Sequence, residues 1–244
     1  MITPIQGEYS KSLISDTPAD LLTEEALHFK KSITKFPEEA IYIYSFERDK
    51  MIYADGWEEV LGYKNNEISM LKLVSISTDE YTQFSNELND KALLFINSQT
   101  HDLELYSFTI ELKKIHKNGN HIPLIWRVAV HKAENGKVTQ IIGHCQINRS
   151  LKFGTIMKYA AYGPAKSKFE ENLNKVLFQH LAISEKEKQA LSLVAQGQSF
   201  KEIATLLNVS QSAIEKRIIP LYKRFKVRSL SHLISFAIEN NIIS

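Results

Sequence analysis

The stretch SEKEKQALSLVAQGQSFKEIATLLNVSQSAIEKRI (residues 184–218) decides how the C-terminal part of the chain folds. Residues 184–187 and 199–202 are both Ser-x-x-Glu capping boxes, in which the serine hydroxyl caps a free backbone N–H and the glutamate reaches back to the cap. Gly197 is a suitable left-handed residue to end the first helix, and a third helix is expected to begin at Ser210. A short helix, a tight turn and a longer helix are the layout of a helix-turn-helix.

The third helix of this stretch has two different faces. Four apolar residues at helical spacing are expected to face the core, namely Ile214, Ile218, Leu221 and Phe225. The opposite face carries Ser212, Glu215, Lys216, Ile219 and Lys223, with Arg217 at its edge. This second face is therefore the one that would meet a partner.

A fourth helix is expected from Ser229, burying Leu230, Leu233, Ile234, Ala237 and Ile238. Phe236 lies about 130° around this helix from the apolar stripe, because successive residues are about 100° apart. The ring would therefore be exposed unless a second copy covers it, which makes Phe236 the candidate dimerisation residue. A lone surface aromatic, or one that contacts the N-terminal domain, is the alternative.

Charge is distributed unevenly although the whole chain has a net charge of only +2. From Ala182 onward there are nine Lys and Arg against five Glu, so this part carries +4 and the remainder −2. A small basic unit joined to a mildly acidic body predicts that any polyanionic partner binds the C-terminal residues.

The run from Ile183 to Ile243 resembles the LuxR/GerE-type DNA-binding domain, through the VAQG turn, the KEIA segment beginning at Lys201, and the VRS segment that follows the third helix. The resemblance implies that the third helix enters the major groove of double-stranded DNA. It places Glu215, Lys216 and Ile219 near the bases, with Ser212 on the same face. It also implies that Lys201, Arg217 and Lys223 contact phosphates. The helix N-terminus at Ser210 is a further phosphate site.

The sequence departs from the LuxR pattern within the third helix. Ala213 stands where Thr is usual, Glu215 where a basic residue is common, and Arg217 where His is usual. Glu215 would repel phosphate in a groove unless it accepts from a cytosine amino group. Pro220 has no N–H to offer the carbonyl of Lys216, so the helix is expected to kink, or to end its DNA-contacting portion, near Ile219.

The N-terminal part is rich in strand signals. Residues 40–46 and 51–54 are short β-branched and aromatic runs that predict a strand pair, and short helices are expected at 57–61 and 66–73. A longer helix follows over 78–97. Three further strands, over 103–116, 121–132 and 137–148, are separated by Asn118-Gly119 and Asn135-Gly136, and Asn-Gly is the strongest short hairpin signal. The pattern predicts an antiparallel meander with one buried face.

Residues 41–148 resemble a PAS domain, through IYAD (52–55) running into WEEVLGY (57–63), the following Glu67-Ile68, and the late Lys117-Asn118-Gly119 and Glu134-Asn135-Gly136-Lys137 turns. The resemblance implies a five-stranded antiparallel sheet over short helices, in a module that binds small molecules, holds cofactors or dimerises. The expected fold class is an α+β PAS-like antiparallel sheet domain plus a C-terminal all-α, four-helix LuxR-type helix-turn-helix domain.

Four segments are expected from these patterns. Residues 1–37 form an N-terminal tail and a lead-in helix whose apolar stripe runs from Leu22 to Phe36, and 38–149 form the PAS-like sensory or dimerisation domain. Residues 150–181 form a connector with helical content, and 182–244 form the DNA-binding domain. Neither a secretory leader nor an apolar run near the ~18 residues of a membrane span is present, so a cytoplasmic protein without membrane association is expected.

Cofactor and catalytic signals are missing from the sequence. The single cysteine, Cys145, lies on the last strand rather than in the flavin-adduct position, and is expected to be a small core residue. The histidines of this domain are spread over strands and turns rather than gathered at a haem site. No catalytic motif is present. We therefore expect no resident cofactor or metal and no enzymatic activity, and an unidentified small-molecule or protein signal is left open for the PAS domain.

The function expected is a homodimeric, DNA-binding transcriptional regulator that couples a PAS sensory or dimerisation module to a LuxR-type helix-turn-helix. The alternative is an interaction protein whose PAS module docks a partner and whose DNA binding is weak or lost through the departures at Ala213, Glu215 and Pro220. A small-molecule-binding enzyme is a third class, which tight cofactor co-purification would favour.

Overall fold

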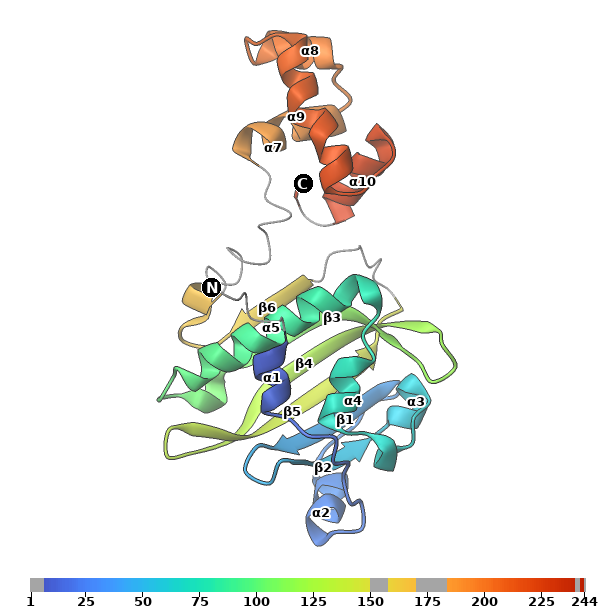
Figure 1. Cartoon of the computed structure of the whole chain (residues 1–244), viewed down its shortest axis with the longest axis vertical. Coiled ribbons are helices and arrows are strands. Elements are labelled where there is room, and N and C mark those ends of the chain that lie inside the picture. Colours follow the sequence, from blue (N-terminus) through green and yellow to red (C-terminus); the bar gives the residue numbers. More distant parts are fainter. Residues whose placement is uncertain (1–6, 150–157, 170–183, 240–241, 244) are drawn as a thin grey trace. The chain divides into compact units, whose positions relative to one another are not determined.

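The computed structural model describes residues 7–149, 158–169, 184–239 and 242–243 (Figure 1). The chain divides into two compact units, Met1–Leu173 and Asn174–Ser244, which are considered separately below. The domain boundary predicted at residue 182, and much of the connector predicted over 150–181, lie outside the described residues.

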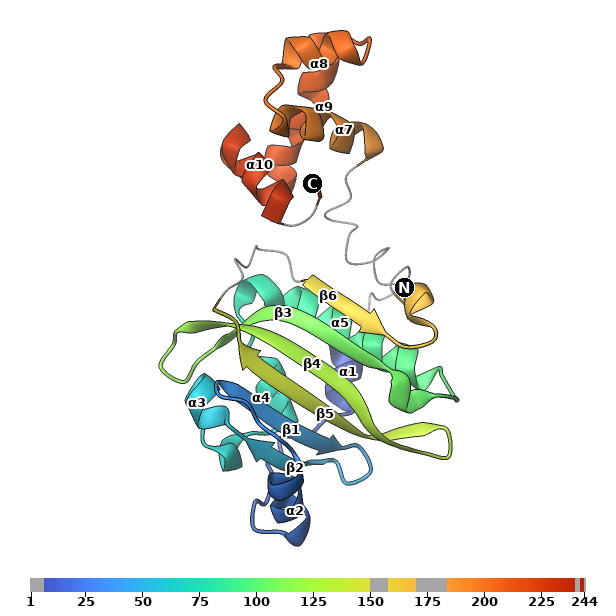
Figure 2. The same ribbon diagram turned by 180° about the vertical axis from the view of Figure 1, so that it is seen from behind.

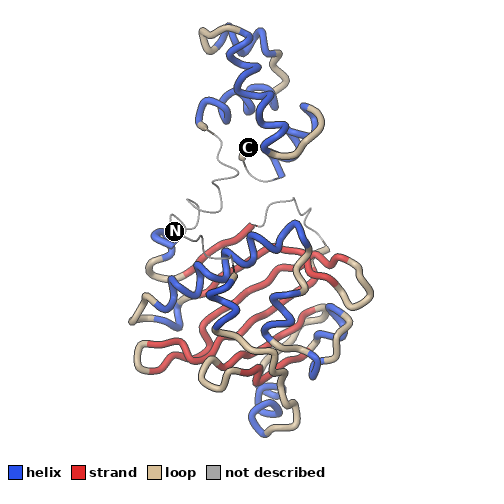
Figure 3. The backbone as a smooth tube through the Cα atoms, in the orientation of Figure 1, coloured by secondary structure: helices blue, strands red, loops and turns tan. Residues whose placement is uncertain are grey.

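An antiparallel sheet is the centre of the first unit (Figures 1 and 3). Its strands in the described part of the chain are β1 (Glu39–Ser45), β2 (Lys50–Asp55), β3 (Ser107–Ile115), β4 (His121–Glu134), β5 (Lys137–Ile147) and β6 (Lys158–Tyr162). Their order across the sheet is β2-β1-β5-β4-β3-β6, and every neighbouring pair is antiparallel. The predicted PAS-like antiparallel fold is confirmed.

The sixth strand, β6, was not predicted. Its residues fall in the segment expected to be a connector with helical content, but they pair with β3 from Ser107↔Tyr162 to Glu111↔Lys158. The reason is that β3 would otherwise end the sheet with unpaired backbone groups, and an edge of this kind accepts another strand. The connector prediction is therefore wrong for residues 158–162.

The hairpin between β4 and β5 forms where Asn-Gly predicted it. Asn135 and Gly136 both have positive φ, at 52° and 71°, which a two-residue turn of this kind requires. The pairing then runs from Glu134↔Lys137 to Leu124↔Ile147, with irregularities near Lys132. The predicted meander of three long strands is confirmed.

Most of the helices cover one face of the sheet, whereas the view from behind leaves much of the opposite face open except near β1 and β2, where Ala26 and Phe29 pack beside Ile41 and Ile43 (Figure 2). The helices of this unit are α1 (Glu8–Ser12), α2 (Glu24–Ser32), α3 (Trp57–Leu61), α4 (Met70–Ser75) and α5 (Asp79–Asn97). Short 3-10 turns lie at Asn65–Glu67 and Leu103–Leu105. The helix expected over 66–73 is thus divided, because the Ser69 hydroxyl accepts from the Lys72 N–H and starts a new helix.

The N-terminal segment is tied to the PAS-like sheet and its helices. The Asp90 carboxylate of α5 accepts from the backbone N–H groups of Gly7 and Ser10, both at 2.8 Å, and so caps α1. Further along, Leu22 and Phe36 are 85% and 62% exposed, so the expected lead-in stripe does not extend to either end. Only the shorter α2 forms, starting after its Thr23 cap.

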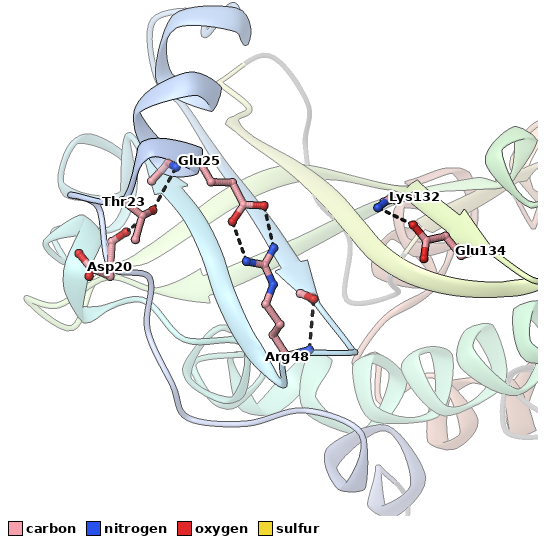
Figure 4. Close-up of polar contacts among 8 residues, drawn as sticks. Asp20, Thr23, Glu25, Arg48, Lys132 and Glu134 are labelled. Atoms are coloured by element: carbon pink, nitrogen blue, oxygen red, sulfur yellow. Dashed lines mark hydrogen bonds and ion pairs between the residues drawn. The ribbon is translucent and has the colours of Figure 1, made fainter.

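Figure 4 shows two ion pairs of this unit, one that ties α2 to the residues after β1 and one within β4. Arg48, which follows β1, donates from both terminal guanidinium nitrogens to the carboxylate of Glu25 in α2, each at 2.7 Å. Lys132 and Glu134 form an ion pair on β4 at 2.5 Å. The bidentate Arg48 contact lowers the pKa of the Glu25 carboxyl, and it fixes orientation better than a single contact could.

Aromatic rings fill the helix-covered side of the sheet. The Tyr42 ring lies 6.0 Å from Trp126 and 6.4 Å from Trp57 between ring centres, and the Trp57 indole donates to the Ile41 carbonyl. Gly143 makes this possible, because a Cβ there would lie 2.0 Å from the Tyr42 ring. Tyr42 and Trp126 of this cluster line the cavity described below.

Candidate nucleic-acid interface and ligand cavity

The second unit consists of short helices with capped starts. They are α7 (Glu185–Ala195), α8 (Phe200–Leu206), α9 (Gln211–Arg224) and α10 (Leu230–Glu239). Both predicted capping boxes are formed: the backbone N–H of Ser184 donates to Glu187, and that of Ser199 to Glu202, each at 2.8 Å. The helix starts predicted from the sequence are confirmed.

The three turns between these helices close in the same way. A left-handed residue ends each helix, namely Gly197 (φ 89°), Asn208 (φ 52°) and Lys226 (φ 53°). In each turn the next N–H bonds back five residues, as Gln198 does to the Leu193 carbonyl at 3.2 Å. The arrangement satisfies carbonyls that a helix end otherwise leaves free, and it sets the angle at which α9 leaves α8.

The core-facing side of α9 agrees with the prediction. Ile214, Ile218 and Leu221 have no exposed surface, and Phe225 is buried behind them. Ile203 of α8 and Leu191 of α7 are equally buried, so one apolar core joins the three helices. The opposite side of α9 is thereby held outward.

The predicted DNA-contacting residues are mostly exposed. Ser212, Lys216, Ile219 and Lys223 lie at i, i+4, i+7 and i+11 and are all exposed, with Ile219 at 55%. We call these four residues the α9 outer face. Glu215 and Arg217 flank it and are half-buried, whereas Lys201 is exposed on α8.

Two polar members of the predicted set already have local partners. The Ser210 hydroxyl accepts from the Ala213 N–H and caps α9, so its side chain is a structural cap as well as part of a helix N-terminus. Glu215 accepts from the Gln211 side chain at 2.9 Å. That hydrogen bond holds the Glu215 carboxylate along the helix, toward its positive end.

Pro220 lies inside α9 and does not end the helix. The helix continues without interruption from Gln211 to Arg224, and the Phe225 N–H still donates to the Leu221 carbonyl at 2.8 Å. Pro220 lies on the exposed side, where water can serve the Lys216 carbonyl that proline cannot reach. The helix itself therefore does not end near Ile219, and the predicted kink, or end of the DNA-contacting portion, at that point stays a prediction.

Phe236 is a core residue and not an exposed dimerisation contact. It is 6% exposed, and its ring stacks on Phe225 with 5.0 Å between ring centres. The periodicity of α10 alone could not show this, because the covering ring comes from the end of α9. Ile238, expected to be buried, is instead 52% exposed.

One ion pair of this unit could not be predicted from local sequence, because its partners lie 37 positions apart. Arg224 at the end of α9 donates to Glu187 near the start of α7, at 3.1 Å. Partial burial opposes ionisation of Glu187, but the hydrogen bonds from Ser184 and Arg224 outweigh it and lower the pKa of the carboxyl. One glutamate therefore both caps α7 and ties α9 to it.

A cavity of about 250 Å³ lies inside the first unit, between the sheet and helices α1, α4 and α5. Its walls are mainly apolar and include Tyr42, Leu88, Phe108 and Trp126. Lys114 of β3 also lines it, although lysine is rarely buried. Mostly apolar walls with a few polar groups are the usual make-up of a small-molecule site.

The remaining candidate ligand residues do not gather in this cavity. Cys145 is buried and free, as predicted, and burial raises the pKa of its thiol. His144 instead pairs with the buried Glu39 at 3.1 Å, and the cavity-lining residues among those described include no histidine. Neither a cluster of metal-ligating side chains nor a helix able to span a membrane occurs in the described part of the chain.

The two units define a class of protein, in which a PAS-like α+β unit is followed by a helix-turn-helix unit. Residues 181–237 match the family of bacterial regulatory proteins called the luxR family, so the C-terminal unit is a LuxR/GerE-type domain.

Two similar proteins are each called "Probable transcriptional regulator ycf29". The one from Porphyra purpurea is 35% identical over 68 residues, which cover 28% of this chain and 32% of that protein. The one from Cyanophora paradoxa is 37% identical over 59 residues, covering 24% and 28%. The chain thus spans about a third of the length of the curated relatives it matches.

Two solved structures are similar over most of the chain. The VqmA dimer of Vibrio cholerae, determined in the absence of target DNA, is 15% identical and covers 91% of this chain and 89% of that one, with a TM-score of 0.36. The Rhodobacter sphaeroides LOV protein is 11% identical and covers 83% and 90%, also with a TM-score of 0.36.

Proposed function

We propose that this chain is a DNA-binding transcriptional regulator, in which the helical unit binds the major groove and the PAS-like unit senses a signal or supports dimerisation. The observation that carries the proposal is the α9 outer face, held outward by the buried Ile214, Ile218 and Leu221 within a LuxR-type domain. The similar proteins called "Probable transcriptional regulator ycf29" support the same function.

The α9 outer face has the chemistry that groove binding needs. Lys216 is central and exposed, and a lysine suits the guanine edge. Lys223, Lys201 and Arg217 are the proposed phosphate contacts, together with the N-terminus of α9 at Ser210. Glu215, held by Gln211, is the group that would select cytosine through its amino group.

We also propose how the chain assembles and takes its signal. The active species is a homodimer on double-stranded DNA, because one small domain makes too few contacts for useful specificity and two-fold proteins bind two-fold sites. The PAS-like unit takes its signal reversibly, without a resident cofactor or metal, and the chain is not an enzyme. Such a protein acts on the genome, and we propose that it does so in the cytoplasm.

The test is selection of fragments from sheared genomic DNA by the full chain, followed by filter binding with single charge reversals. Lys216→Glu is expected to abolish enrichment, since it reverses the centre of the α9 outer face. Lys137→Glu reverses an equally exposed lysine in the β4–β5 hairpin of the other unit and is the matched control.

If the unmodified chain enriches no fragment, the interaction-protein alternative replaces this proposal. If both reversals weaken binding equally, the attraction is general and α9 is not the contact. Enrichment that survives Lys137→Glu and is lost with Lys216→Glu supports the proposal.

A further inference from the structure

The cavity of the PAS-like unit contains an amine in an unusual position. Lys114 is only 3% exposed, and its side chain runs from β3 into the cavity wall. The neighbouring Lys113 is not among the cavity-lining residues. Successive strand residues point to opposite sides of a sheet, so two adjacent lysines have different surroundings.

The Lys114 amine is held by two neutral acceptors. Its Nζ donates to the Leu73 carbonyl at 2.6 Å and to the Ser77 hydroxyl at 2.7 Å. An ammonium group has three N–H donors, and the remaining contact is the face of the Trp126 ring, 5.1 Å from Nζ. The amine is therefore fixed in direction while one donor is left for a ligand.

No carboxylate of the described residues forms an ion pair with this amine. Burial lowers the pKa of the Lys114 amine from 10.5 to about 7, and burial also raises the pKa of the neighbouring Cys145 thiol, which therefore stays neutral and supplies no counter-charge. A buried cation without a partner is costly, so an anionic group entering the cavity would be strongly favoured.

The rest of the cavity limits the body of the ligand. A cavity of about 150 Å³ lined by apolar side chains holds a benzene ring, so about 250 Å³ can take a ring with a short side chain. Five aromatic residues line the walls, namely Tyr42, Phe46, Tyr106, Phe108 and Trp126. Aromatic rings prefer edge-to-face or offset contact with other rings.

We propose that the cavity binds a small aromatic monocarboxylate, with its ring among these aromatic walls and its carboxylate on the Lys114 amine. One cation fits one carboxylate, and a charge-assisted hydrogen bond is roughly twice as strong as a neutral one. A phosphate or a dicarboxylate would bring a second charge that no described lining residue neutralises. The use of this ligand as the regulatory signal rests on the proposed function, but its binding does not.

The experiment is calorimetry on the full chain with two probes of the same shape. At pH 6, below the pKa of about 7 of the Lys114 amine, this amine is mostly charged. The carboxylate of 3-phenylpropanoate is charged at this pH as well, whereas 3-phenylpropanamide is neutral. We expect the carboxylate to bind at least ten times more tightly than the amide. Equal or weaker binding of the carboxylate by the unmodified chain would overturn the proposal.

Two variants assign the effect to one residue. Lys114→Met should remove the preference for the carboxylate while the amide still binds, and Lys113→Met, with the same change of charge one position earlier, should retain the preference. A preference that persists in Lys114→Met also overturns the proposal. Intrinsic tryptophan fluorescence shows whether the variants are folded, since Trp57 and Trp126 both lie in this unit. Because no DNA is present, failure here leaves the DNA-binding proposal untouched.

Discussion

Lys114 gives the first unit a pH-dependent stability that does not depend on any ligand. The pKa of its amine is about 7 in the folded chain and 10.5 when exposed, so between these values the unfolded chain binds more protons. Stability therefore rises with pH from about 7 to about 10.5, by at most about 1.4 kcal/mol per pH unit. Below pH 7 both states are protonated and this gain is absent.

Urea unfolding of the unmodified chain and of Lys114→Met, followed by tryptophan fluorescence at pH 7, 8 and 9, measures this effect. The unfolding free energy of the unmodified chain should increase relative to that of Lys114→Met as the pH rises, because methionine does not titrate. Other ionisable groups cancel in the difference, and Lys113→Met is the control. A difference that stays flat across this range contradicts the assignment.

Lys216 and Arg217 are adjacent on α9 but should contribute differently to DNA binding. Lys216 is exposed at the centre of the α9 outer face, and Lys216→Ala is expected to cost about 1 to 3 kcal/mol with relaxed preference at one base pair. Arg217 is half-buried at the edge of that face, and Arg217→Ala should weaken all sequences nearly equally and lower the salt slope by about one.

Binding titrations at several salt concentrations, on a selected duplex and on single-base variants of it, separate these two effects. If neither substitution changes affinity at moderate salt, α9 is not the contacting element.

At the scale of the element, α9 and α10 are joined by the stacked rings of Phe225 and Phe236. Removing a buried ring costs about 3 to 5 kcal/mol, so Phe236→Ala should open the helical unit and speed amide hydrogen exchange in α9 at least a hundredfold. Ile238→Ala, two residues along and exposed, should change exchange little. Equal effects from the two substitutions would contradict the buried position of Phe236.

Elements whose cause is local could be predicted from the sequence. The capping boxes at Ser184 and Ser199, the Asn135-Gly136 turn and the buried stripe of α9 all depend on residues within a few positions of each other. For the same reason the candidate DNA-contacting residues could be named before the structure, and four of them form the exposed α9 outer face.

The elements that were missed depend on distant partners. Helix α1 is only five residues long and is capped by Asp90, 83 positions after Gly7. Strand β6 exists because β3 offers it an edge. The cavity amine of Lys114 could not be predicted either, since Leu73 and Ser77, which fix it, come from the α4 region and its adjoining loop, far from β3 in the sequence.

In the whole molecule, the proposed binding to a two-fold DNA site requires two copies of the chain. Sedimentation of the full chain with a duplex that carries two selected half-sites, one helical turn apart, should give a complex of two chains. A duplex in which one half-site is scrambled should bind more weakly. Single chains, both free and on the two-site duplex, would contradict the dimer.

The central claim is that the helical unit gives this chain sequence-specific binding to DNA. The most direct measurement is the ratio of dissociation constants of the full chain for a selected duplex and for a shuffled duplex of the same composition, at about 150 mM salt. We expect a ratio of at least about 10³ in favour of the selected duplex, which is the lower end of the range by which specific DNA-binding proteins prefer their sites over non-specific DNA. Equal affinity for the two duplexes would contradict it.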